Sequence, residues 1–290
     1  MSIYETVTER ILNQMKSGVI PWRKSWSSGL PRSLATGRAY RGINILILAS
    51  SPFESSYWLT FRQAQQLGGH VRKGERATPV VFWKWRTEEE LQQLAKDGKG
   101  RGIAPCVPFV FPVFNLEQIG GVDRPADDHR IAPEARHAIA DDILGLMPRP
   151  PTITHSSTSQ PAYLPSEDRI TLPHLSQFTS ADHYFAVMFH ELVHSSGHVS
   201  RLDRFRPDGT DLGERYSFEE LVAEFGAAFL CAWAGIHNPA TEELQASYID
   251  GWAAAFARDS RMLMRAASAA QRAVDYVRGI VPAQGDPAEG

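Results

Sequence analysis

The stretch MFHELVHSSGH at residues 188–198 contains two histidines four positions apart, with a glutamate directly after the first. On an α-helix, residues i and i+4 lie on one face, so His190 and His194 can bind one metal ion together. A catalytic zinc ion typically has three protein ligands and keeps one position for water. Glu191 can take a proton from that water and return it to a leaving amine. The stretch therefore predicts a zinc-dependent hydrolytic centre, with His190 and His194 as ligands and Glu191 as the catalytic residue.

The third metal ligand must come from elsewhere in the chain. His198 directly follows the expected end of the helix, which favours a place in the turn or behind one of the metal ligands. The segment SFEELVAEFGAAFLCAW (217–233) has the pattern of a helix, with Glu220 and Glu224 one turn apart on it. This segment resembles the downstream helix of gluzincins, and the resemblance implies that Glu220 binds the metal and Glu224 holds a ligand histidine in its orientation. The two roles could be exchanged, and Glu219 is a weaker candidate.

Other features of this centre stay open in the sequence. The group that would stabilise the oxyanion of an intermediate could be Tyr216, His198 or Arg201. The segment ITLP (170–173) could form an edge strand along which an extended peptide pairs. Two ordinary histidines beside an exposed acidic helix are the alternative to a metal centre.

Length and composition indicate a globular protein with one large domain or two of ordinary size. The chain has 290 residues, of which 43% are apolar and 22% charged. No apolar run approaches the roughly 18 residues of a membrane span, and the start lacks the apolar core of an export signal. The two cysteines, Cys106 and Cys231, exclude a disulfide framework and a four-cysteine zinc site. We therefore expect a cytoplasmic protein with no membrane partner.

The net charge of −3 conceals an uneven distribution along the chain. Residues 1–115 contain 16 Lys and Arg against 8 Asp and Glu, a balance of +8. Residues 116–290 contain 14 against 25, a balance of −11. This asymmetry favours two domains with different partners, the basic one facing phosphates, with accidental surface charge as the alternative.

Basic and aromatic residues alternate in the first half, at 22–26, 38–41 and 83–86. Single-stranded nucleic acid offers phosphates to basic groups and unpaired bases to aromatic rings, worth roughly 1–3 kcal/mol per stacked base. The pattern predicts binding of single-stranded DNA, and the sequence shows no motif for binding a duplex. Aromatic rings are also ordinary core material, so any one ring could instead hold the domain together. The candidate DNA contacts are Trp22, Arg23, Lys24, Tyr40, Arg41, Lys73 and Lys84.

The expected elements indicate an α+β protein of two domains. In residues 1–128 we expect a small α+β domain with strands at 78–85 and 106–115, and with a helix opened by the capping box of Thr60. One aromatic face of the strand at 78–85 must be core. The apolar segment GINILILAS (42–50) is buried, but its type is undecided.

Residues 129–290 are expected to form a mainly helical domain around the histidine motif. Short strands are predicted within 151–173, between one helix and a series of later ones. The predicted helices span 133–147, 181–196, 217–235, 241–257 and 258–279.

Several ordered motifs resemble those of one known family. YETVTERILNQMKSGVIPWRKSW, GRAYRGINILIL, WLTFRQAQQLGGHVRKGERATPVVFWKW and FPVFNLEQ resemble the N-terminal domain of ArdC-type antirestriction proteins. MFHELVHSSGH, the RLDR after it and YSFEELVAEFGAAFLCAWAGI resemble the zincin-like metallopeptidase domain that accompanies it, with the downstream glutamate ligand of gluzincins. Together the motifs cover nearly all of residues 1–280.

The resemblance implies a protein of conjugative plasmids or related mobile elements, which binds single-stranded DNA and protects incoming DNA from host restriction. It implies a single-stranded-DNA-binding domain at 1–128 and a zincin-like domain at 129–290. It also implies His190 and His194 as metal ligands, Glu191 as the catalytic position and the region of Glu220 as the third ligand. The expected metal is Zn²⁺, with Mn²⁺ as another possibility, and a protein substrate is possible.

Two other functions remain open. The chain could be a cytoplasmic metallopeptidase whose first half binds proteins through its aromatic residues. It could instead be a DNA-binding protein in which the metal only stabilises the fold. In that last case, Glu191→Gln would leave every function intact.

Overall fold

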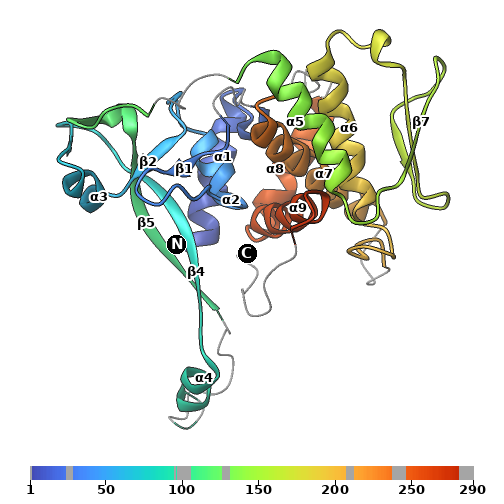
Figure 1. Cartoon of the computed structure of the whole chain (residues 1–290). Coiled ribbons are helices and arrows are strands. Elements are labelled where there is room, and N and C mark those ends of the chain that lie inside the picture. The colour runs from blue at the N-terminus through green and yellow to red at the C-terminus, as the bar shows by residue number, and fades with distance from the viewer. Residues whose placement is uncertain are drawn as a thin grey trace.

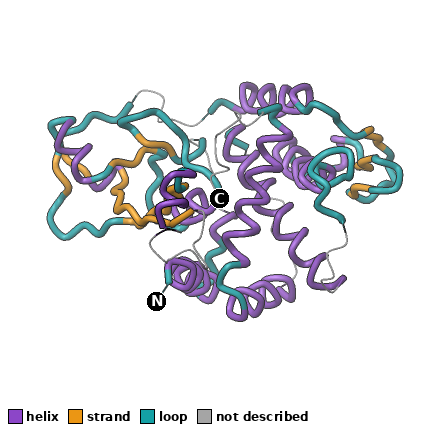
Figure 2. Tube along the Cα trace, turned by 90° about the horizontal axis from the view of Figure 1, so that it is seen from below, coloured by secondary structure: helices purple, strands orange, loops and turns teal. Residues whose placement is uncertain are grey.

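The computed structural model describes residues 2–23, 29–94, 96, 106–125, 131–206, 212–236 and 246–280. Its strands gather at two ends of the molecule, with most of the helices between them (Figure 1, Figure 2). This mixture confirms the predicted α+β class. Each helix in the described ranges is too short or too polar to cross a bilayer.

The first half combines short helices with a sheet of order β1-β2-β5-β4 and a separate pair, β3-β6. Its helices are α1 (Ile3–Lys16), η1 (Pro21–Arg23), α2 (Ile43–Ala49), α3 (Phe61–Gln66), α4 (Glu88–Leu94) and η3 (Leu116–Gln118). Its strands are β1 (Arg32–Ser33), β2 (Tyr57–Leu59), β3 (His70–Val71), β4 (Thr78–Trp85), β5 (Cys106–Asn115) and β6 (Ile119–Gly120). β4 and β5 pair antiparallel and have the predicted bounds, and the capping box of Thr60 opens α3 as expected.

The segment of undecided type is helix α2, and all of its residues are buried. An element that is apolar on every side carries no periodicity that could separate helix from strand. It packs against β4 and α9. The Asn44 side chain ties it to β4, because its amide donates to the Val81 carbonyl and its oxygen accepts from the Val81 N–H, both at 2.7 Å.

Strands β4 and β5 extend from the body as a long two-stranded arm (Figure 1). At the base of the arm Val80 and Val81 are both buried. Further out, Phe82 and Trp85 are exposed, whereas Trp83 is half-buried with its ring centroid 6.1 Å from that of Tyr4. The expectation that one whole aromatic face is core is therefore wrong for Trp85, because the arm extends past the body.

The second half is mainly helical, with a three-stranded sheet at one end. Its helices are α5 (Pro133–Leu146), η4 (Leu175–Gln177), α6 (Ala181–Ser195), α7 (Leu212–Ala234), α8 (Ala246–Arg258) and α9 (Met262–Val277). Its strands are β7 (Thr152–His155), β8 (Ala162–Leu164) and β9 (Arg169–Leu172) in the order β7-β9-β8. The segment at 170–173 therefore begins in the central strand, and the prediction of an edge strand there is wrong.

One hydrophobic core runs through both halves of the molecule. Trp22, from η1, is 1% exposed, and its ring centroid lies 4.9 Å from that of Phe225 and 6.0 Å from that of Trp252. Helix α1 packs on α8, and α2 packs on α9. The division at 128/129 stays a prediction, but in the described residues the two parts share the largest core, while the first half adds two smaller clusters of its own.

Candidate metal centre

Helix α6 places the two histidines of the motif side by side. The Ser180 side chain caps this helix by accepting the His183 N–H at 3.1 Å, as the sequence predicted. Buried Phe189 fixes one face of α6 in the core. On another face, the Nε2 atoms of His190 and His194 lie 3.0 Å apart.

Helix α7 contributes the third potential ligand. The carboxylate of Glu220 lies 3.7 Å from His190 Nε2 and 3.5 Å from His194 Nε2. One potential ligand atom from each of the three residues lies within 4.8 Å of the other two. Two imidazole nitrogens and one carboxylate are a donor set that catalytic zinc sites use, so these residues fit a divalent metal.

Two further glutamates of α7 hold the outer nitrogens of the rings. Glu224 lies 3.5 Å from His190 Nδ1, and Glu219 lies 3.5 Å from His194 Nδ1. Arg204 in turn donates to both carboxylate oxygens of Glu219, at 2.6 and 3.1 Å. Glu220 is therefore on the ligand side and Glu224 behind His190, while Glu219 has the same supporting position at His194. The sequence did not predict that position for Glu219.

The close approach of α6 and α7 depends on a glycine. A Cβ atom built at Gly226 would lie 2.6 Å from a methyl carbon of Val193. Val193 directly precedes His194, and Gly226 follows Glu224 by two positions. The small residue thus lets the ligand-bearing turns of the two helices meet.

The centre is strongly anionic around the histidines. Burial alone would lower the pKa of His190, but its hydrogen bond to Glu220 and the charges of Glu224 and Glu191 raise that pKa to about 9. Burial would raise the pKa of Glu220, yet the neighbouring histidines keep it below its usual value. A site with this excess of carboxylates attracts a cation.

A groove of about 1800 Å³ opens at the centre. Glu191 and both histidines line it, as do Ala162 and Tyr163 of the edge strand β8. β8 therefore holds the edge position next to the centre that the sequence assigned to the segment at 170–173.

Of the three residues considered for oxyanion stabilisation, Tyr216 alone lines this groove. Arg201 is buried in a bidentate ion pair with Asp168 at 2.7 and 2.8 Å. His198 lies in the turn after α6 and bonds Ser200 Oγ at 2.8 Å, which agrees with its expected place. Among these three, the geometry favours Tyr216.

The predicted DNA contacts divide into buried and exposed groups. Trp22 is buried in the core, so its expected role as a stacking ring is wrong. Tyr40 packs on a smaller core cluster, and burial raises its pKa to about 12. Arg41 forms an ion pair with Asp275 of α9, although its side chain stays 38% exposed. Lys73 is exposed.

The remaining candidates are Lys84, Arg23 and Lys24. Lys84 is exposed on the arm and forms an ion pair with Glu90 at 3.0 Å. Lys24 and the side chain of Arg23 lie outside the described part of the chain.

The sequence did not single out the exposed phenylalanines of the arm. Phe82 of β4 pairs across the strands with Phe109 of β5, and its ring contacts Phe111 edge to face with a centroid distance of 5.3 Å. All three rings are 44–45% exposed on one face of the arm. Their alternation in CVPFVFPVF was readable as a strand face, but nothing in the sequence marks that face as solvent-exposed.

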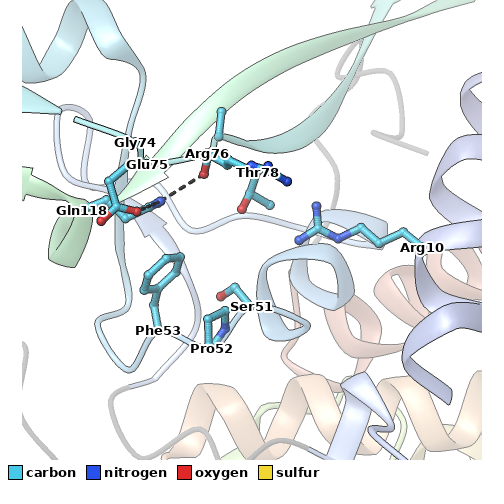
Figure 3. A pocket seen from close by; sticks show the side chains of 10 residues that line it. Arg10, Ser51, Pro52, Phe53, Gly74, Glu75, Arg76, Thr78 and Gln118 are labelled. Carbon is cyan, nitrogen blue, oxygen red and sulfur yellow. Dashed lines mark hydrogen bonds between the residues drawn. The ribbon is translucent and has the colours of Figure 1, made fainter. Parts of the chain in front are cut away.

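A smaller hollow of about 450 Å³ lies where α1 approaches the sheet. Figure 3 shows Arg10 on one side of it and Phe53 on the opposite side, with Arg76 above. Gln118 donates to the Arg76 carbonyl at 3.0 Å and so holds that turn in place. The hollow brings basic groups and an aromatic ring together, although the sequence separates them widely.

Two protein families match the two halves of the chain. Residues 1–114 match the N-terminal domain of the anti-restriction factor ArdC. Residues 149–269 match a zincin-like metallopeptidase family. Both assignments agree with the family that the sequence motifs indicated.

Solved structures and curated relatives give the same result. The chain is 34% identical to the antirestriction protein ArdC from plasmid R388 in its Mn(II)-bound crystal structure, with a TM-score of 0.75 over 98% of this chain and 100% of that one. It is also 33% identical to the protein y4eC of Sinorhizobium fredii, over 95% of this chain and 91% of that one. A DNA primase TraC of Escherichia coli is 36% identical over 94% of this chain, which spans only 27% of the primase.

Proposed function

Because the chain belongs to the ArdC antirestriction family, we propose that it binds single-stranded DNA entering a cell and protects that DNA from host restriction. We place it in the cytoplasm of a host of conjugative plasmids or related elements. Its second half holds a divalent metal, Zn²⁺ or Mn²⁺, and acts as a metallopeptidase on a protein substrate. The convergence of His190, His194 and Glu220 beside Glu191 carries the second part of this proposal.

Exposed rings and basic groups of the first half support the DNA-binding part. Stacking on Phe82, Phe109 and Phe111 requires no rearrangement, because these rings already face solvent. Exposed Lys73 and Lys84 lie on the same half and can neutralise phosphates. These residues, with Arg41, replace the buried Trp22 as the proposed contacts.

The residues of the centre have distinct proposed roles. When bound, the metal would lower the pKa of a water and polarise a peptide carbonyl. Glu191 accepts the proton and delivers it to the leaving amine. Glu224 and Glu219 fix the orientation of the two imidazoles, and the Tyr216 hydroxyl hydrogen-bonds the developing oxyanion.

The DNA-binding part is tested by titrating the whole chain with a single-stranded oligonucleotide and with the matching duplex, at two salt concentrations. The intact chain is used because its two halves share a core. We expect preference for the single strand and weaker binding at higher salt, since phosphate neutralisation produces that dependence. Equal affinity for the duplex would contradict the proposal.

The peptidase part is tested with Glu191→Gln and His190→Ala. Glu191→Gln should keep zinc binding and abolish hydrolysis of a casein substrate, whereas His190→Ala should lose both. If Glu191→Gln changed nothing while His190→Ala unfolded the second half, the metal would be only structural. If the chain bound peptides independently of salt and did not bind DNA, the result would favour a metallopeptidase whose first half binds proteins.

A further inference from the structure

The groove at the metal centre is lined by groups of opposite charge. Carboxylates line it at the metal centre, among them Glu191 and Glu220. Four arginines from the end of α8 and one side of α9 line the same groove, with one acidic residue beside them, Asp259. We call these arginines the arginine stripe; its members are Arg258, Arg261, Arg265 and Arg272.

The stripe follows from helical spacing. Arg261, Arg265 and Arg272 are separated by four and seven positions, which places them on one side of α9. The opposite side is packed into the core through residues such as Leu263 and Val274. These three side chains therefore point away from the core, into the groove.

Most of the positive charge of the stripe is not neutralised within the described ranges. Arg265 forms an ion pair with Asp259 at 2.8 Å. For Arg258, Arg261 and Arg272, no carboxylate of the described residues lies within ion-pair distance. Burial and then the positive charge of nearby Arg204 lower the pKa of Arg272. An anionic ligand would supply the missing charge.

Aromatic rings lie against two of these guanidinium groups. The guanidinium carbon of Arg261 lies 5.5 Å from the centroid of the Tyr4 ring, and Tyr4 in turn contacts Trp83 of the arm. Arg265 lies over the Phe218 ring at 5.9 Å. Tyr4, Trp83 and Phe218 all line the groove. Rings and guanidinium groups thus form a continuous surface from β4 to α9.

We propose that this groove binds a single strand of DNA, with phosphates on the arginine stripe and bases against Tyr4, Trp83 and Phe218. The inference rests on the proposed binding of single-stranded DNA and extends its contacts into the half of the chain that is acidic in total. An acidic peptide would also match the charge of the arginines. Carboxylate side chains do not stack on the aromatic rings beside these arginines, whereas unpaired bases do. The strand then runs beside the metal centre.

The salt dependence of binding tests the proposal. For single strands, log K falls with log salt by about 0.7 per phosphate contact. The double variant Arg261→Gln, Arg272→Gln should therefore lower that slope by about 1.4 and weaken oligo(dT) binding about tenfold at low salt. The matched control Arg62→Gln, Arg149→Gln also removes two exposed arginines, but neither lines the groove, and its slope should stay unchanged.

A second variant tests the stacking of bases, separately from the charge of the groove. Trp83→Ala should weaken oligo(dT) binding by the loss of a stacked base, worth about 1–3 kcal/mol or roughly 5–150-fold, with an unchanged salt slope. Circular dichroism and zinc content show that each variant is folded.

Three results would overturn the inference. If the chain binds oligo(dT) but the stripe variant keeps the full slope, DNA does not use the groove, although the proposed function stands. If a polyglutamate peptide binds in a stripe-dependent manner while oligo(dT) does not, the groove belongs to a protein substrate. If the chain binds no single-stranded DNA at all, the proposed function fails together with the inference.

Discussion

Glu220 and Glu224 are one helical turn apart, yet they meet the same histidine ring from opposite sides. The ligand position of Glu220 and the supporting position of Glu224 follow from which ring nitrogen each carboxylate faces. Replacing a residue behind a metal ligand typically costs 10–100-fold in metal affinity. We expect Glu224→Gln to weaken zinc binding by about that factor and Glu220→Gln to weaken it further. Competition with a chromogenic chelator measures both, and the reverse order would mean that the roles are exchanged.

The first arginine of the RLDR motif after α6, Arg201, forms a buried ion pair with Asp168. Arg201 is 1% exposed at its side chain and also donates to the Ser195 carbonyl at the end of α6. Removing one partner of a buried pair leaves a charge without compensation, which costs about 3–5 kcal/mol. Because Asp168 is 35% exposed, we expect Asp168→Ala to lower the free energy of unfolding by the lower figure, about 3 kcal/mol. Urea denaturation measures the change.

The same pair predicts a pH dependence. Burial would raise the pKa of Asp168, but the hydrogen bonds from Arg201 and Tyr163 outweigh it and hold that pKa below its usual value. A carboxylate with a lowered pKa stabilises the fold above its unfolded pKa of about 3.9, and this contribution disappears as pH falls through the folded pKa. Stability measured from pH 5 to pH 2 should therefore fall less steeply in Asp168→Asn than in the natural chain. If the stability of Asp168→Asn fell as steeply as that of the natural chain, Asp168 would not have the lowered pKa.

At the scale of elements, the contact between α6 and α7 decides the centre. Gly226→Ala would push its new methyl group into Val193, whose branched side chain has little freedom to move. We expect a loss of about 1–3 kcal/mol in stability, together with weaker zinc binding, because the two ligand-bearing turns separate. Gly145→Ala in α5 is the matched control, since its Cβ would meet nothing within 4 Å and should stabilise the helix by about 0.5–1 kcal/mol. Thermal melts with and without zinc compare them.

Elements with a clear local pattern could be predicted from the sequence. The strands β4 and β5, the capping box at Thr60 and the histidine spacing on α6 are all set by near neighbours in the chain. Burial of Trp22 and the place of Glu219 could not be predicted, because each depends on segments far away in sequence. The basic neighbours of Trp22 in PWRKSW indicated an exposed ring. The rings that bury it, Phe225 and Trp252, lie some two hundred residues later in the sequence.

At the scale of the whole molecule, the shared core predicts joint unfolding. Separating residues 1–128 from 129–290 would expose Trp22 on one piece and Phe225 with Trp252 on the other. Exposing one large apolar side chain to water costs roughly 1.5–3 kcal/mol, so exposing these three rings costs several kcal/mol. We therefore expect one calorimetric transition for the intact chain, and neither piece alone should unfold cooperatively. Two resolved transitions would show that the halves are independent.

The tryptophan at the junction also has a consequence for gene rearrangement. A recombination event that joined the first half to a foreign partner would leave Trp22 without the rings that enclose it, so selection would remove the product. The two halves should therefore be inherited as one cassette. The primases TraC agree with this expectation, because they match 94% of this chain, both halves together, within proteins several times longer.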